Sequence, residues 1–363
     1  MNQTIDVPIS SEELLSIAKR MNATYSDLSP FALIKAGAGN APTKEINNPE
    51  LISNQEELLP DVAQLLNLLT GTQAMGAVTY ACDLIALHAS AFHVRKGEKV
   101  KVAALMDTGK GQRLHYPPDF DNFFRTMEQF WPLTVVKRCG LDQDFPPAEA
   151  QLLLACVDAT RRHYFQALAN GQDIVATPQL TFQDIMAAAN ASLDGVHLLA
   201  PHVTNSLNLS PLGEADAQTG LEALMQKGLL RFSNSMFEIG KEAQKIAVAL
   251  ILPEGHLNAL AACHDDNGNI LKTSVFAVQG RAGAALMFSG DDDSVKITGL
   301  SPAQLFELAA TLVMQPYDIL RLKRVEATPE TPEAGKTSKF CPACGAKHKP
   351  EAKFCSECGK PLA

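Results

Sequence analysis

Two stretches of the chain decide its fold because they carry the same order of signals: SAFHVRKGEKVKVAALM at residues 90–106 and SVFAVQGRAGAALMF at residues 274–288. In each stretch two apolar runs flank a short break that contains glycine, which is the pattern of neighbouring antiparallel strands. A helix follows each stretch, over residues 119–131 in the first copy and residues 302–313 in the second. Three pairs of landmarks, Cys82/Cys263, Phe92/Phe276 and Phe123/Phe306, lie 181, 184 and 183 residues apart. This near-constant offset predicts an internal duplication.

Two further helices and a hairpin are predicted upstream of the second copy. The helices cover residues 181–191 and 213–227, and the strands of the hairpin cover residues 229–232 and 236–239. This order resembles a winged helix. A winged helix that binds DNA presents basic side chains on its second helix. The charged residues of that helix are Glu214, Asp216, Glu222 and Lys227. We therefore expect the segment to serve packing or protein contact.

Capping boxes mark the start of three predicted helices. In a capping box, two side chains three residues apart bond to each other's backbone N–H groups. The pairs are Ser10 with Glu13, Thr181 with Asp184, and Ser301 with Gln304. The first pair begins a helix at residues 10–21, which is where a winged-helix-like segment of the first half would start.

These signals predict an α+β fold of two related halves, each made of winged-helix-like helices and a small antiparallel sheet with a packing helix. We expect the first half at residues 1–135, a helical connector at 136–172 and the second half at 173–324. Each closing helix should pack on the sheet of its own copy. In element order, two such halves resemble the type VII secretion chaperones of mycobacteria, and that resemblance implies a protein-binding function.

A separate module is predicted after residue 324. Residues 325–338 read VEATPETPEAGKTS and contain two prolines and a glycine, which favours a flexible linker. A coil of this length spans about 20 Å on average. Residues 339–363 follow the linker and hold four of the eight cysteines of the chain.

Two Cys-x-x-Cys-Gly pairs stand in the sequence FCPACGAKHKPEAKFCSECGKPL at residues 340–362. Each pair directs two thiolates at one point, and two pairs complete a tetrahedron. We expect one structural zinc ion per chain, held by Cys341, Cys344, Cys355 and Cys358. The pattern resembles the short zinc-ribbon family, which implies a docking module for protein or nucleic acid. A pair of disulfides or a redox motif is the alternative, and the lack of a secretory signal at the N-terminus disfavours it.

Charge is unevenly distributed along the 363 residues, whose formal net charge is −9. Residues 1–320 hold 22 Lys and Arg against 35 Asp and Glu, whereas residues 321–363 hold 9 against 5. An acidic body repels nucleic acid, while the basic tail leaves contact with an anionic partner open. The longest apolar stretch, residues 246–252, is far shorter than the ~20 residues of a membrane helix. We therefore expect a cytoplasmic protein that does not insert into membranes.

Three groups of residues could suggest catalysis, and each also fits a turn. Asp107-Thr108-Gly109 resembles the loop of aspartic proteases. His264-Asp265-Asp266 stands directly before an Asn-Gly hairpin signal. Residues 291–293 are three consecutive aspartates. We interpret all three groups as turns, so the sequence predicts no catalytic and no cofactor-binding residue.

The function predicted from the sequence is that of a cytoplasmic, non-enzymatic adaptor or chaperone-like protein that binds another protein and carries a structural zinc ribbon. Two alternatives stay open. One is a nucleic-acid-associated regulator that uses the winged helix and the ribbon together. The other is an enzyme whose site is assembled from distant residues between the two halves.

Overall fold

A computed structural model of the chain describes residues 4–21, 24–38, 46, 48–53, 57–97, 99–131, 142–173, 177–193, 199–250, 255–280, 285–290 and 294–320. The chain divides into two compact units, Met1–Leu320 and Arg321–Ala363, and all the described residues belong to the first. The linker predicted at 325–338 and the zinc ribbon predicted at 339–363 therefore lie outside the described residues.

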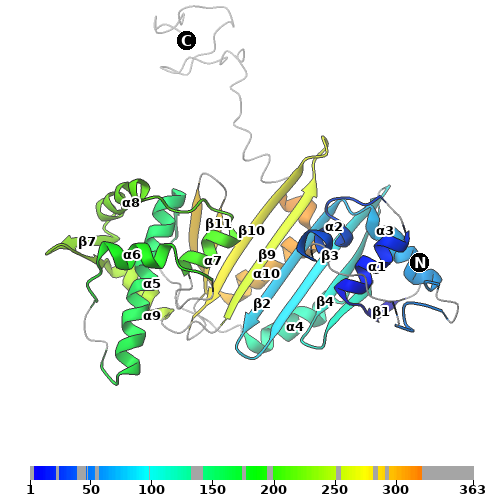
Figure 1. Ribbon diagram of the computed structural model, residues 1–363, viewed down its shortest axis with the longest axis horizontal. Helices are drawn as coiled ribbons and strands as arrows, with labels where there is room; N and C mark the ends of the chain where they lie inside the picture. Colours follow the sequence, from blue (N-terminus) through cyan, green and yellow to red (C-terminus); the bar gives the residue numbers. More distant parts are fainter. Residues whose placement is uncertain are drawn as a thin grey trace, which may run out of the picture. The chain divides into compact units, whose positions relative to one another are not determined.

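The first unit is built on one antiparallel sheet of ten strands (Figure 1). In spatial order the strands are β1 (Ile5–Pro8), β5 (Gln112–Tyr116), β4 (Lys99–Asp107), β3 (Ala86–Lys96), β2 (Ala74–Cys82), β9 (Gly255–His264), β10 (Ile270–Gln279), β11 (Ala285–Gly290), β12 (Val295–Leu300) and β6 (Asp142–Phe145). Burial alternates along strands such as β12, where Val295 and Ile297 are buried and Lys296 is exposed. This period of two is the reason these segments are strands.

The pairing of β2 with β9 joins the two sets of strands into a single sheet. Ala74 lies opposite Cys263, Val78 opposite Ala259 and Cys82 opposite Gly255, so the two strands pair along their whole length. Each strand would otherwise present a long row of unpaired backbone groups. The prediction of a small sheet in each half is therefore wrong, because there is one large sheet.

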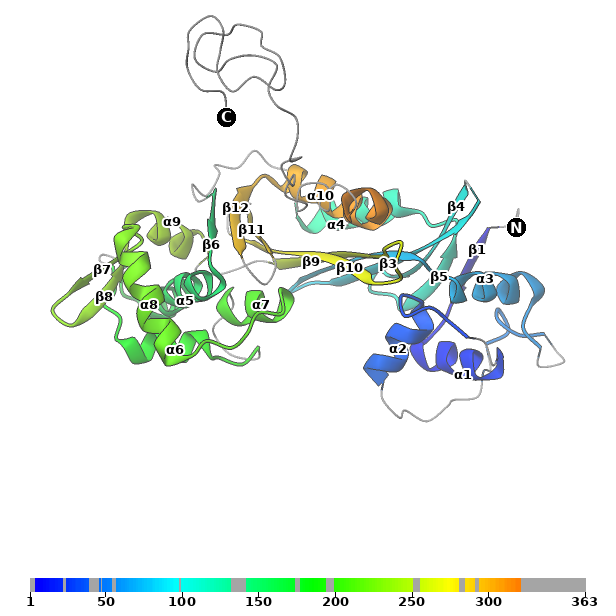
Figure 2. The same ribbon diagram turned by 90° about the horizontal axis from the view of Figure 1, so that it is seen from above.

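Helices cover both faces of this sheet (Figure 2). One face carries α4 (Phe120–Phe130) and α10 (Pro302–Met314), whose apolar residues share a core with the central strands. One end of the other face carries α1 (Ser11–Met21), α2 (Pro30–Ala38) and α3 (Pro60–Thr70). The other end of that face carries α5 (Pro147–Ala169), α6 (Phe182–Ala189), α7 (Leu199–Ser206), α8 (Glu214–Gln226), α9 (Lys241–Ala249) and the hairpin of β7 (Leu230–Ser233) and β8 (Met236–Ile239).

Helix α10 lies across the centre of the sheet and contacts β2, β3 and β9. The ring of His93 on β3 donates from Nε2 to the carbonyl oxygen of Val313, at 2.9 Å. Gly76 on β2 allows the close approach, because a Cβ atom there would lie 2.4 Å from the carbonyl oxygen of Leu312. Helix α10 is expected to pack on the sheet of its own copy; it contacts β9 of that copy, and it also packs on β2 and β3 of the first copy.

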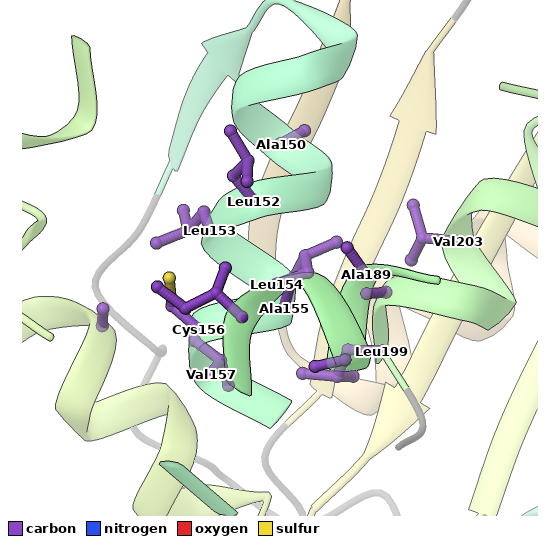
Figure 3. Close-up of a cluster of buried hydrophobic side chains, with 14 of the residues drawn as sticks. Ala150, Leu152, Leu153, Leu154, Ala155, Cys156, Val157, Ala189, Leu199 and Val203 are labelled. Carbon is purple, nitrogen blue, oxygen red and sulfur yellow. The ribbon is translucent and has the colours of Figure 1, made fainter. Parts of the chain in front are cut away.

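Helix α5 is the centre of the larger helical group (Figure 3). Every residue from Ala150 to Arg161 is buried, so the middle of the helix is covered on all sides. Helices α6, α7, α8 and α9 all contact it. Residues 136–172 are predicted to be a helical connector, and α5 within this range is also the element on which four other helices pack.

The three capping boxes predicted from the sequence are confirmed. Their backbone N–H groups donate to the partner side chains over 2.8–3.3 Å. They start helices α1, α6 and α10.

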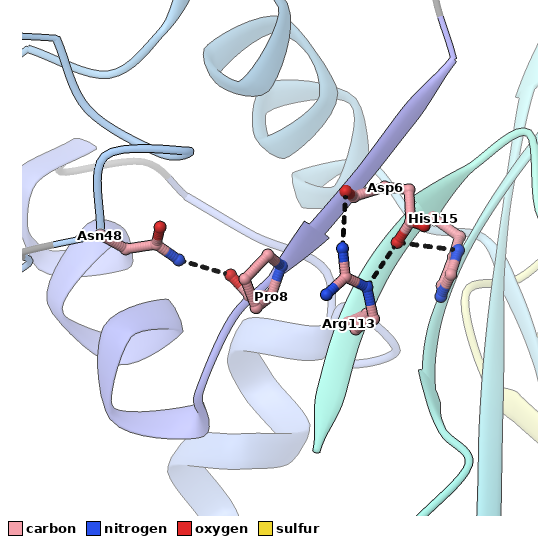
Figure 4. Close-up of polar contacts among 5 residues, drawn as sticks. All are labelled: Asp6, Pro8, Asn48, Arg113 and His115. Carbon is pink, nitrogen blue, oxygen red and sulfur yellow. Dashed lines mark hydrogen bonds and ion pairs between the residues drawn. The ribbon is translucent and has the colours of Figure 1, made fainter. Parts of the chain in front are cut away.

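The short edge strand β1 is fixed by polar contacts at both ends (Figure 4). The Nε atom of Arg113 donates to the carboxylate of Asp6 at 2.7 Å, and the ring of His115 lies 3.4 Å from the same carboxylate. The side chain of Asn48 donates to the carbonyl oxygen of Pro8 at 2.7 Å. These contacts hold a strand of only four residues on the sheet.

Candidate functional site

The four cysteines predicted to hold zinc, Cys341, Cys344, Cys355 and Cys358, lie outside the described residues. Within the residues that the structure does describe, no group of three or more His, Cys, Asp or Glu side chains could hold a metal ion. Burial raises the pKa of the Cys156 thiol far above its ordinary value, so this cysteine stays protonated.

Two of the three suspected catalytic groups are confirmed as turns. The carboxylate of Asp107 accepts hydrogen bonds from the backbone N–H groups of Gly109 and Gly111, at 2.8 and 3.2 Å. The carboxylate of Asp265 accepts from Asn267 and Asn269 in the same way, at 2.8 Å each. These bonds are typical of aspartates that stabilise turns. Residues 291–293 lie outside the described residues.

The candidate site of the body is a band of the sheet that the helices leave uncovered. It lies on the face that carries α1–α3 and α5–α9, between these two groups of helices. Side chains beside it are buried under α1–α3, as Phe92 and Ala262 are, or under α5–α9, as Phe276 and Phe288 are. The residues of the band are Thr79, His88, Asp107, Leu260, Ile270 and Lys272, which we call the docking face.

The strand register relates these residues, with Asn258 beside them, across the sheet. Asp107, His88, Thr79 and Asn258 are consecutive neighbours across β4, β3, β2 and β9. On β9 and β10 the docking face then continues through Leu260, Lys272 and Ile270, which lie on the same side of the sheet because residues two apart on a strand share a face.

A hydrogen-bonded histidine forms the polar end of the docking face. The Nδ1 atom of His88 lies 2.9 Å from the hydroxyl of Thr79, and its Nε2 atom lies 2.8 Å from the hydroxyl of Ser90. Burial lowers the pKa of His88, although the nearby Asp107 carboxylate opposes this shift. A neutral imidazole offers one donor and one acceptor, which the two hydroxyls satisfy. This end therefore presents neutral hydrogen-bonding groups beside one carboxylate.

Two aliphatic side chains form the other end of the docking face. Leu260, within the central strand β9, is 39% exposed, and Ile270, the first residue of β10 after the hairpin turn, is 44% exposed. The exposed Lys272 lies between them. Exposed aliphatic side chains with a rim of polar groups are typical of surfaces that bind other molecules.

Helix α7 borders the docking face and is anchored to the strands beside it. The carbonyl oxygen of Ser206 accepts from the hydroxyl of Ser274 at 3.3 Å, and the hydroxyl of Ser206 accepts from the side chain of Asn258 at 3.2 Å. The ring of His202 stacks on Phe276, with 5.8 Å between the ring centroids. The border is thereby fixed by residues of both the helix and the sheet.

The docking face is not visible in the sequence. Each of its residues belongs to a strand whose pattern is ordinary, and the face exists only because β2 pairs with β9 and because two helical groups stop short of each other. The one sequence signal is Leu260, an aliphatic residue in β9 on the side opposite Leu257 and Ala259.

Among the described helices, none is long and apolar enough to cross a membrane.

Comparisons with known proteins give three findings. Residues 340–362 match a zinc-ribbon domain family, which confirms the resemblance noted for the tail. Curated proteins include no sequence that matches the chain. Among solved structures, the chain is similar to one titled as the Mycobacterium tuberculosis type VII secretion system chaperone EspG5 in complex with the PE25-PPE41 dimer. The sequences are 9% identical, the TM-score is 0.35, and the match covers 86% of this chain and 95% of that chain.

Proposed function

We propose that this protein is a cytoplasmic, non-enzymatic adaptor or chaperone-like protein that binds a partner protein on the docking face. One observation carries the proposal: Leu260, on the central strand β9, is 39% exposed between two groups of helices, and Ile270, at the start of the neighbouring strand β10, is 44% exposed. Covering them would remove apolar surface from water, at roughly 25 cal/mol for each Å².

The dimensions of the docking face fit one secondary-structure element of a partner. From β4 to β10 there are four steps between neighbouring strands, each about 4.8 Å, which gives a width of about 19 Å. The charges at its two ends differ, because Asp107 lies at one end and Lys272 near the other. A matching partner element presents aliphatic side chains in its middle, a basic residue towards Asp107 and an acidic residue towards Lys272.

The order of strands supports a duplication. The meander β2–β5 is followed by α4 and has β1 at its outer edge, while the meander β9–β12 is followed by α10 and has β6 at its outer edge. The contacts of the second half also support a winged helix, since Leu180 before α6 pairs with Phe237 of the β7–β8 hairpin. We assign this segment to packing and protein contact.

Charge on the winged-helix-like segment does not favour a DNA-binding function. Glu214, Asp216 and Glu222 of α8 are all exposed. Lys227, directly after α8, is held by the carboxylate of Glu149 at 2.6 Å. A surface with these charges repels phosphates.

We assign the tail a role as a docking module. It would hold one structural zinc ion through Cys341, Cys344, Cys355 and Cys358. The family match at residues 340–362 supports this assignment. Four thiolates fill the tetrahedron and leave no open position, so the ion would stabilise the ribbon and would not catalyse a reaction.

Affinity capture from the native cytosol, followed by mass spectrometry, tests the docking face. The variant Leu260→Glu/Ile270→Glu places two carboxylates on the face, and the control Leu84→Glu places one on a hairpin residue that is 83% exposed. We expect the wild-type chain and the control to retain the same partner and the double variant to lose it. A partner that the double variant retains would contradict the assignment of the face. The absence of any protein partner of the wild-type chain would contradict the function itself.

A further inference from the structure

The hairpin between β3 and β4 carries an unusual concentration of positive charge. Residues 95–101 read RKGEKVK, which is four basic residues and one acidic residue in a chain with a net charge of −9. This is not part of the docking face. It lies at the opposite end of β3 and β4 from His88 and Asp107.

Three of these basic residues share one face of the hairpin. Lys96 and Lys99 are direct partners across the two strands, and Lys101 lies opposite Val94. Residues two apart on a strand share a face, so Lys96, Lys99 and Lys101 form one cluster, which we call the lysine face. Opposite Cβ atoms lie about 5 Å apart, and alternate residues of a strand lie about 7 Å apart.

No acid in the described part of the chain neutralises the lysine face. Three other lysines of the body have an acidic partner: Lys227 pairs with Glu149, Lys245 with Glu242 and Lys296 with Asp142. The ion pairs of the described residues include none of the three lysines of this face. Like charges directly opposite each other in a sheet are destabilising, so the pair of Lys96 and Lys99 weakens the hairpin unless an anion lies between them.

Contacts on the other side of the hairpin hold it in a fixed position. The backbone N–H of Arg95 donates to the side-chain oxygen of Gln73 at 3.1 Å, and its guanidinium lies 4.9 Å from the centre of the Tyr317 ring. Gly97 has a φ of 66°, a conformation that glycine adopts without strain and that allows the tight turn. The lysine face is therefore presented on a braced hairpin, which reduces the entropy lost on binding.

We propose that the lysine face binds a short acidic segment of a partner protein. Carboxylates on alternate residues of an extended peptide lie about 7 Å apart, which matches the spacing of Lys99 and Lys101. A long polyanion such as duplex DNA would continue past the hairpin onto a body with 22 basic and 35 acidic residues, which repels it. A short acidic segment covers the lysine face alone and avoids this repulsion.

Fluorescence anisotropy with the full-length protein and a labelled octapeptide of alternating Glu and Ser tests the proposal. The test variant is Lys96→Gln/Lys99→Gln/Lys101→Gln. The control is Lys19→Gln/Lys110→Gln/Lys241→Gln, which changes the net charge equally at exposed lysines elsewhere. Both variants keep the basic tail, so a difference between them reports the lysine face.

We expect the wild-type chain and the control to bind the peptide at ~50 mM salt and the test variant to bind it roughly tenfold more weakly. Circular dichroism should show that both variants melt within a few degrees of each other, because the lysines are at the surface. Equal binding by the two variants, or no binding by the wild-type chain, would overturn the proposal. Tighter, lysine-dependent binding of a duplex of 20 base pairs would overturn the choice of partner. The capture experiment with Leu260 and Ile270 does not involve these lysines, so the two proposals can fail separately.

Discussion

A buried ion pair in α5 offers the sharpest test of how the larger helical group is held together. Asp158 and Arg161 are both almost fully buried. One carboxylate oxygen of Asp158 lies 2.5 Å from the guanidinium of Arg161, and the other accepts from the backbone N–H of Ala200 at the start of α7. The guanidinium in turn donates to the carbonyl oxygen of Leu250 at the end of α9. One pair of side chains thus joins three helices.

Replacing Asp158 by alanine removes the carboxylate that contacts the guanidinium of Arg161 and the backbone N–H of Ala200. The guanidinium of Arg161 then stays buried and loses the Asp158 carboxylate, and removal of one member of a buried pair costs about 3–5 kcal/mol. We expect the free energy of unfolding to fall by that amount. Urea unfolding followed by circular dichroism measures this free energy, provided that the slope of the transition stays unchanged.

The double variant Asp158→Leu/Arg161→Leu is the matched control. It removes both charges together, so no buried charge is left without a partner, and replacing a buried pair by apolar residues is often close to neutral. We expect the double variant to be more stable than Asp158→Ala. A loss below about 1 kcal/mol for Asp158→Ala, which is the range of an exposed pair, would show that this pair does not hold the three helices together.

Three further predictions concern the sheet, the histidines and the tail. Gly76→Ala should lower the free energy of unfolding by about 1–3 kcal/mol, because its new Cβ would lie 2.4 Å from a backbone oxygen of α10. Urea unfolding measures this loss. Gly71→Ala is the milder control, because its Cβ would meet no atom closer than 3.7 Å. Burial lowers the pKa of His93 from 6.5, so the folded state favours the neutral ring. The contribution of the neutral ring to the free energy of unfolding is therefore complete above pH 6.5 and is lost as the pH falls towards the lowered pKa. Thermal melts between pH 8 and pH 5 should therefore show a smaller loss of stability for His93→Gln than for the wild-type chain, and parallel losses would contradict this account. Cys341→Ser/Cys344→Ser should release about one zinc ion per chain, which elemental analysis measures. The melting temperature of the body should stay unchanged, because the tail is a separate unit. A large shift in this temperature would show that the two units depend on each other.

Local features of the fold could be predicted from the sequence because their causes are local. The capping boxes at Ser10, Thr181 and Ser301 depend on residues three positions apart, and the structure confirms all three. The same holds for the Asp107 and Asp265 turns, where one carboxylate bonds to backbone groups two and four residues later.

Features that depend on distant residues could not be predicted in this way. The alternation of β2 and β9 shows that each is a strand, but it does not say which strand lies beside it, and nearly two hundred residues separate them. The position of α10 could not be predicted either, because the helix packs over Gly76 of β2 only when the two sets of strands form one sheet. The docking face also depends on distant residues, because Leu260 is exposed where the helices on that side of the sheet stop short of β9.

Site-specific photo-crosslinking tests whether a partner protein covers the docking face. A photoreactive benzoylphenylalanine replaces Leu260 in one version of the full-length chain and Leu84 in another, since both residues are exposed but only Leu260 belongs to the docking face. Both versions are irradiated in the native cytosol, and the products are identified by mass spectrometry. The account predicts one protein joined to position 260 and none joined to position 84. The absence of any product at position 260, or the same products at both positions, would contradict it.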